Sequence, residues 1–226
     1  TQLLKEFSAA NKWRRQTAVR VLAERIQQAD AAQQQAVVQQ LANLLQETAA
    51  EAPVLEALWT LHLSGKLDDE LLGQLLHHPL ADARRWGLRL LGDRRWANSA
   101  QLSTMNLLAA QEQHPEVLSQ LASTLRRLPA AVAVPILPTL LQRSELLEDR
   151  HIPLLVWWAV EGHCRVGFEE LSPHVGVRIP QDVDRSLAPR ERVVKLLEDP
   201  QLWRQPLVEQ WLLRRLMQRF ALESVL

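Results

Sequence analysis

The sequence contains no tyrosine, a single cysteine and only seven glycines among its 226 residues. Strands are rich in β-branched and aromatic residues, and the turns between strands use glycine, so this composition argues against a sheet-rich fold. Leucine is abundant, with 44 residues, as are alanine and glutamine, and these residues favour helices. Hydrophobic residues make up 47% of the chain, which is ample for a buried core. We therefore predict an all-α fold.

The chain also lacks a second thiol, a long apolar run and a net charge. Cys164 alone excludes an internal disulfide, and no uncharged run reaches the roughly 18 residues of a membrane span. The 26 lysine and arginine residues balance 26 aspartate and glutamate residues, whereas dedicated nucleic-acid binders carry a basic excess. The sequence starts at Thr1 without a methionine or a signal peptide, so we expect it to be a processed or excised part of a longer protein.

Segments of the sequence resemble one another at regular intervals. The segment 15–22, Arg-Gln-Thr-Ala-Val-Arg-Val-Leu, matches the segment 84–91, Arg-Arg-Trp-Gly-Leu-Arg-Leu-Leu, at an offset of 69 residues. The segments 57–61 and 117–122 continue the pattern, at intervals of 39 and 34 residues from earlier matches. Intervals of about 30–40 residues are typical of solenoids built from two-helix repeats.

Apolar residues at helical spacing, divided by glycine, proline and aspartate, predict the helices. Pro135 and Pro138 predict that the helix over 131–143 is kinked or starts late. The predicted helices cover residues 2–8, 12–28, 32–48, 53–64, 69–77, 82–92, 99–112, 115–127, 131–143, 149–164, 189–198 and 203–222.

Together these patterns predict a right-handed α-solenoid of HEAT-like helical repeats. The repeat array is expected over residues 1–165. An irregular loop, rich in proline and glycine over 165–187, and C-terminal helices that pack on the array are expected over 166–226.

Three blocks of sequence resemble one bacterial family. The block 11–25 begins Asn-Lys-Trp-Arg-Arg, the segment 57–61 reads Ala-Leu-Trp-Thr-Leu, and the block 152–161 reads Ile-Pro-Leu-Leu-Val-Trp-Trp-Ala-Val-Glu. Helix pairs at this spacing resemble HEAT repeats. Over residues 3–165 the chain resembles the helical region of the membrane-bound dehydrogenase and haem-binding CxxCH proteins that are abundant in planctomycetes.

The resemblance implies a multidomain redox protein. Members of that family join an N-terminal β-propeller, similar to quinoprotein dehydrogenases, to a HEAT-like region and a C-terminal c-type cytochrome segment. This sequence resembles the helical region only, and Cys164 has no partner thiol that would allow covalent haem attachment. The resemblance implies an extracytoplasmic, non-catalytic interaction or scaffold module with no cofactor of its own. Its partner would be a neighbouring domain of the parent chain or another protein.

No group of residues predicts a catalytic or metal site. His77 and His78 are adjacent, so they point in different directions on a helix, and we expect them to close a helix end as imidazolium groups. Asp68 and its two acidic neighbours are expected to cap a helix. A zinc set of His151, Glu161, His163 and Cys164 would require the helix to break, because His151 lies more than two turns from the others. A contribution from His174, which would have to fold back from the loop, stays open.

The eight tryptophans form two groups. Those within apolar helical faces are expected in the core, so truncation of Trp86 to alanine is expected to cost about 3–5 kcal/mol. The others lie beside arginines or at helix starts, where packing and a Trp–Arg binding surface both stay open. The first group is Trp59, Trp86, Trp157 and Trp158, and the second is Trp13, Trp96, Trp203 and Trp211.

Arginine doublets recur along the chain and give the candidate interaction surface. We favour ion pairs between helices for them, but doublets aligned by stacked repeats would form a basic stripe. Such a stripe defines the alternative function, a nucleic-acid-binding HEAT-like protein of the DNA-glycosylase type, and a HEAT-like bilin lyase is a third. Because the net charge is zero, nucleic acid is not the expected partner. The candidate residues are Arg14, Arg15, Arg84, Arg85, Arg126 and Arg127.

Overall fold

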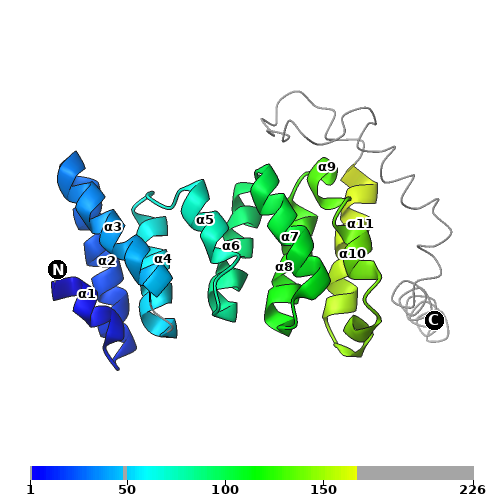
Figure 1. Cartoon of the computed structure of the whole chain (residues 1–226), viewed down its shortest axis with the longest axis horizontal. Helices are drawn as coiled ribbons and strands as arrows, with labels where there is room; N and C mark the ends of the chain where they lie inside the picture. Colours follow the sequence, from blue (N-terminus) through cyan, green and yellow to red (C-terminus); the bar gives the residue numbers. More distant parts are fainter. Residues whose placement is uncertain (1, 48–49, 167–226) are drawn as a thin grey trace, which may run out of the picture. The chain divides into compact units, whose positions relative to one another are not determined.

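The computed structural model describes residues 2–47 and 50–166. Within these ranges every regular element is a helix and no strand occurs, so the predicted all-α fold is confirmed (Figure 1). The helices predicted over 189–198 and 203–222, and nearly all of the loop 165–187, lie outside the described residues, as do Trp203 and Trp211. The division predicted at residue 165 stays a prediction for the same reason.

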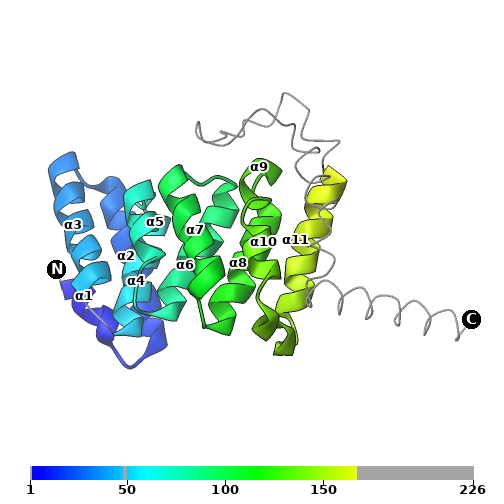
Figure 2. The same cartoon turned by 45° about the vertical axis from the view of Figure 1, so that its right-hand side comes forward.

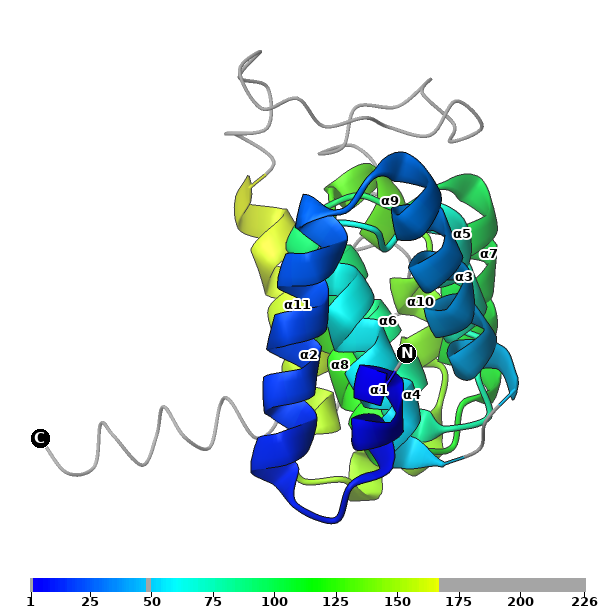
Figure 3. The ribbon, with the colours of Figure 1, turned by 90° about the vertical axis from the view of Figure 1, so that its left-hand side faces the viewer.

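The chain divides into two compact units, residues 1–87 and 88–226, and the division falls inside one helix, α6. In the first unit α4 packs against both α2 and α3, and the 3₁₀ turn η1 packs against α2 and α4 (Figure 3). The elements of this unit are α1 (Gln2–Lys5), η1 (Glu6–Ser8), α2 (Lys12–Gln28), α3 (Ala31–Glu47), α4 (Glu51–Leu63), α5 (Asp69–Leu75) and the first half of α6 (Ala81–Arg94).

Polar side chains set the helix starts in the first unit. The Asn11 side chain accepts a hydrogen bond from the backbone N–H of Trp13 at 2.8 Å and begins α2. Asp68 accepts one from the N–H of Leu71 at 2.8 Å and begins α5, which confirms its predicted capping role. Each side chain satisfies a backbone donor that the first helical turn leaves without a partner.

The second unit contains the remainder of α6 and the later helices. Its described elements are α7 (Ser99–Gln111), α8 (Pro115–Arg127), α9 (Ala130–Ala133), α10 (Leu137–Leu141), the 3₁₀ segment η2 (Ser144–Glu148) and α11 (Ile152–Val166). Helix α8 packs along α11 (Figure 2). The segment 131–143 is two short helices and not one kinked helix, because Pro135 cannot continue α9 and Pro138 starts α10.

Five side chains, all buried except that of Gln27, link helices within each unit by bonding to backbone carbonyls. The two partners are always 33–38 residues apart, close to the repeat interval in the sequence. The bonds join Gln27 Nε2 to Leu63 O (3.0 Å), His78 Nε2 to Leu45 O (2.8 Å), Thr124 Oγ1 to Leu88 O (2.8 Å), Arg143 Nη1 to Ala109 O (3.1 Å) and His163 Nε2 to Leu125 O (2.7 Å). Most of these carbonyls lie in the last turn of a helix, where the helix itself supplies no donor.

The tryptophans only partly follow the prediction. Trp59 and Trp86 are half-buried and meet edge to face, with ring centroids 5.7 Å apart. The prediction that Trp158 lies in the core is wrong, because this side chain is 37% exposed. Adjacent residues on a helix point about 100° apart, so Trp157, which is half-buried, and Trp158 cannot both face the interior. Trp13 is 71% exposed, so packing does not explain it.

Candidate functional site

The first arginine doublet fixes the entry of the chain into α2. Arg15 donates from Nη1 to the carbonyls of Ala9 (2.8 Å) and Ala10 (3.1 Å), and its Nε lies 3.0 Å from Oε1 of Glu56. Glu56 is only 3% exposed, and burial raises the pKa of its carboxyl although Arg15 opposes that shift. Arg14 is exposed and pairs with Glu6 at 2.8 Å. Arg15 therefore has a structural role.

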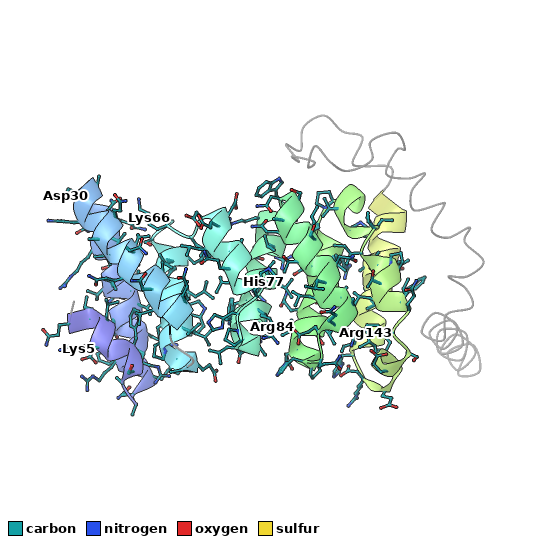
Figure 4. The ribbon with its side chains drawn as sticks, in the orientation of Figure 1. Lys5, Asp30, Lys66, His77, Arg84 and Arg143 are labelled. Carbon is teal, nitrogen blue, oxygen red and sulfur yellow. The ribbon has the colours of Figure 1, made fainter. Side chains whose placement is uncertain are left out.

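The second doublet repeats this arrangement 69 residues later. Arg84, which lies in α6 (Figure 4), donates from Nη1 to the carbonyls of His78 (2.8 Å) and Pro79 (2.9 Å), six and five residues before it. Arg15 binds the carbonyls at the same two relative positions. Arg85 pairs within α6 with Asp82 at 2.6 Å. The sequence match thus extends to equivalent contacts, and ion pairs and carbonyl bonds engage all four arginines of these two doublets.

His78 closes the end of the α5 region as a neutral imidazole. Its Nε2 lies 2.8 Å from the carbonyl oxygen of Leu45, and its Nδ1 lies 3.1 Å from the N–H of Leu80. Nε2 must therefore carry the proton and Nδ1 must accept. Burial lowers the pKa of His78, and the charge of Arg84 lowers it further. The structural role is as predicted, but the predicted imidazolium form is wrong, because a second proton would face the N–H of Leu80.

The second unit contains an open cleft of about 520 Å³ that brings three arginines together with a tryptophan. Two of these arginines form the doublet at the end of α8, and the third follows α6. Apolar side chains and a buried histidine complete the walls. The lining residues are Arg95, Ser123, Arg126, Arg127, Leu128, Leu155, Trp158 and His163.

Glycines leave room for the two arginines of α8. The guanidinium carbon of Arg126 lies 5.9 Å from the ring centroid of Trp158, and a Cβ added at Gly162 would lie 3.4 Å from Arg126 Cγ. Arg127 pairs with Asp93, and a Cβ added at Gly92 would lie 3.4 Å from its Nη1. Arg126 therefore lies across α11, where the cation contacts the face of the indole ring.

Arg95 reaches the cleft from a backbone conformation that favours glycine. Its φ of 53° is the only positive φ outside glycine among the described residues. Gly65 takes the corresponding conformation after α4, with a φ of 71°. Both residues turn the chain at a helix end, where their N–H groups bond to the carbonyl three residues earlier. An arginine in this region costs of order 1 kcal/mol, and residues under such strain are concentrated at functional sites.

The cleft carries positive charge that is not fully compensated. His163 is buried, and burial lowers the pKa of its imidazole, so the ring adds no charge near pH 7. Asp93 pairs with Arg127. The guanidinium groups of Arg95 and Arg126 have no carboxylate partner among the described residues. The cleft can therefore bind an anion through two guanidinium groups beside an apolar wall.

Only some residues of the predicted interaction surface lie at the cleft, and the cleft also contains residues that were not predicted. Arg126 and Arg127 line one cleft, whereas Arg14, Arg15, Arg84 and Arg85 belong to the first unit. The sequence prediction placed Trp158 in the core and left Arg95 out of the candidate surface. A signal for Arg95 was present, since the run Gly-Asp-Arg-Arg-Trp over 92–96 ends a helix without a glycine at the turn.

The described residues contain no group of three or more histidine, cysteine, aspartate or glutamate side chains that could hold a metal ion. Of the zinc set, His163 bonds to the carbonyl of Leu125, and the side chain of Cys164 lies outside the described part. No helix in the described ranges is long and apolar enough to cross a membrane. No protein-family model matches the chain, and no curated protein matches it. The family resemblance therefore stays a prediction.

Proposed function

We propose that this chain is a non-catalytic interaction module built as an α-solenoid of HEAT-like repeats. The observation that carries the proposal is the equivalence of Arg15 and Arg84, which make the same carbonyl contacts 69 residues apart. The side-chain bonds to carbonyls at intervals of 33–38 residues support it, because two-helix repeats of this length contact their neighbours at that interval. Repeats of this kind serve mainly to present binding surfaces.

In this proposal the module belongs to an exported redox protein. The blocks that begin Asn-Lys-Trp-Arg-Arg and end Trp-Trp-Ala-Val-Glu support that assignment. The module would hold a dehydrogenase-like propeller and a c-type cytochrome in a geometry for electron transfer, or bind a separate protein. It needs no cofactor for this role, and its location would be extracytoplasmic.

The coding DNA on both sides of this chain tests the redox assignment. We expect a propeller with a signal peptide upstream and a Cys-x-x-Cys-His segment downstream. A start codon directly before the Thr1 codon and a stop codon directly after Leu226 would contradict the assignment and leave a free-standing helical protein.

Two assays on the purified chain test the non-catalytic role. We expect no oxidation of sugars or alcohols with an artificial electron acceptor, and turnover would refute the proposal. We also expect no binding of a labelled DNA duplex at 50 mM salt. Binding that weakens steeply with salt would favour the nucleic-acid alternative.

A further inference from the structure

We propose that the cleft of the second unit binds a short acidic peptide segment that also carries an apolar side chain. This inference rests on the proposed interaction function and adds the chemistry of the partner. It concerns the cleft lined by Arg95, Arg126 and Trp158.

Charge is the first reason. Arg95 and Arg126 place two guanidinium groups on one cleft without a carboxylate partner among the described residues, while Asp93 neutralises Arg127. A guanidinium group presents parallel N–H donors that match a carboxylate, so two such groups can accommodate two acidic side chains, or one acidic side chain and a terminal carboxylate.

The walls supply the second reason. Leu128, Leu155 and the partly exposed indole of Trp158 line the same cleft as the guanidinium groups. An apolar ligand side chain would cover this surface and remove it from water. A volume of about 520 Å³ lies in the range of cavities that hold a compact ligand, and it is sufficient for a few peptide residues.

The third reason is that contacts within the protein hold Arg126 and Arg127 in place before any ligand binds. Trp158 and the space above Gly162 position Arg126, and Asp93 positions Arg127. Arg95 extends from a strained backbone at a site where glycine would fit without strain. Side chains that are already ordered lose less entropy on binding, so this arrangement favours affinity.

A nucleic-acid duplex fits these features less well. Phosphate backbones are bound by rows of unneutralised cations on an extended surface. Here the two uncompensated guanidinium groups lie in a concave site with leucine walls. An acidic peptide uses both the charge and the apolar wall, whereas a duplex would use the charge alone.

Selection from a phage-displayed library of random eight-residue peptides on the full 226-residue chain tests the proposal. We expect enrichment of peptides that combine aspartate or glutamate with a leucine or an aromatic residue. Enrichment of basic or uncharged peptides, or no enrichment, would overturn the proposal.

The enriched peptide, labelled with fluorescein, is then titrated by fluorescence anisotropy against variants. Arg126→Gln should weaken binding about tenfold or more, because a charge-assisted hydrogen bond is lost. Arg85→Gln is the control, since it makes the same substitution at the second arginine-doublet position but in the first unit, outside the cleft. We expect Arg85→Gln to change the affinity less than twofold.

Arg95→Gly separates binding from folding. Glycine relieves the strain of the positive φ, so this variant should unfold at the same temperature as the parent or a higher one. It should nevertheless bind the peptide at least fivefold more weakly, because one guanidinium group is missing. If both Arg95→Gly and Arg126→Gln bind the peptide as tightly as the parent, the cleft is not the peptide site. That result would overturn this inference but would not contradict the proposed interaction function. If a labelled DNA duplex binds more tightly than the peptide, and Arg126→Gln weakens duplex binding, the ligand of the cleft is nucleic acid and not a peptide.

Discussion

The doublets Arg84-Arg85 and Arg126-Arg127 are identical in sequence but differ in their surroundings. In the first unit, Arg84 bonds to two backbone carbonyls and Arg85 pairs with an aspartate one turn away. In the second unit, Arg127 pairs with Asp93 while Arg126 lies over an exposed indole beside a cleft. The sequence of a doublet therefore does not determine its role. The neighbouring residues determine whether an arginine stabilises the fold or keeps its charge available for binding a ligand.

The largest effect should come from breaking the arginine contacts of the first unit. Arg15→Ala removes two carbonyl bonds and leaves the buried carboxylate of Glu56 without its guanidinium partner. Loss of one partner of a buried ion pair costs about 3–5 kcal/mol. Arg14→Ala, which removes an exposed pair with Glu6, should cost about 1 kcal/mol or less. Urea unfolding followed by circular dichroism measures both, and equal costs would contradict the structural role of Arg15.

The second contrast is between the stability contributions of Trp86 in the first unit and Trp158 in the second. Trp86→Ala should destabilise the protein by about 2–3 kcal/mol, because it removes a half-buried indole and its edge-to-face contact with Trp59. This is less than the cost expected for a fully buried tryptophan. Trp158→Ala should cost only about 1 kcal/mol, since the ring is 37% exposed and contacts Arg126. The two variants are compared by thermal unfolding, and a larger loss for Trp158→Ala would reverse the contrast.

The third contrast is in pH dependence. Burial lowers the pKa of His78 in the first unit and of His163 in the second, from the ordinary value of 6.5. The unfolded chain therefore binds protons more readily, so the stability due to each neutral ring is complete above pH 6.5 and is lost as the pH falls below it. Each histidine contributes a slope of up to about 1.4 kcal/mol per pH unit.

Single variants separate the two histidines. Between pH 7 and pH 5, His78→Gln and His163→Gln should each lose less stability than the parent protein does. Urea titrations at several pH values measure these losses. The same loss in a variant as in the parent would show that its histidine is not responsible for the pH dependence.

The smallest effects should come from two glycines, and their signs should differ. A Cβ at Gly87 in α6 would lie 3.1 Å from Leu75 Cβ, so Gly87→Ala crowds the packing on α5 and should cost about 1 kcal/mol. A Cβ at Gly162 in α11 would meet only the Arg126 side chain, at 3.4 Å and beyond. Gly162→Ala should therefore stabilise the protein by about 0.5–1 kcal/mol through helix propensity. Differential scanning calorimetry measures the sign of the stability change in both variants. A destabilising Gly162→Ala would show that the Arg126 side chain cannot move to accommodate the added methyl group.

The sequence was sufficient for features that depend on near neighbours. Asp68 and Pro115 are start signals that lie next to the helices they begin, and α2 starts and ends at the predicted residues 12 and 28. The offset of 69 residues also predicted equivalent positions, and Arg15 and Arg84 do make equivalent contacts.

Contacts between distant residues were harder to predict. Glu56 is 41 residues from Arg15, and nothing in its local sequence distinguishes this buried carboxylate from an exposed one. The cleft depends on Arg95, Arg126 and Trp158 arriving from three separate segments. Helical periodicity placed both Trp157 and Trp158 on an apolar face. It could not show which of these two neighbours is the more buried, and in the structure it is Trp157.

The bonds from side chains to helix-end carbonyls have a consequence for protein synthesis. Pro129 has no N–H, so it cannot bond to the Leu125 carbonyl, which receives its donor from His163 instead. His78 and Arg143 likewise bond to carbonyls that precede them in the chain, at Leu45 and Ala109. Each of these helix ends therefore waits for 33–38 further residues to leave the ribosome before its last turn is closed. Folding during translation should consequently advance in steps of about one helix pair.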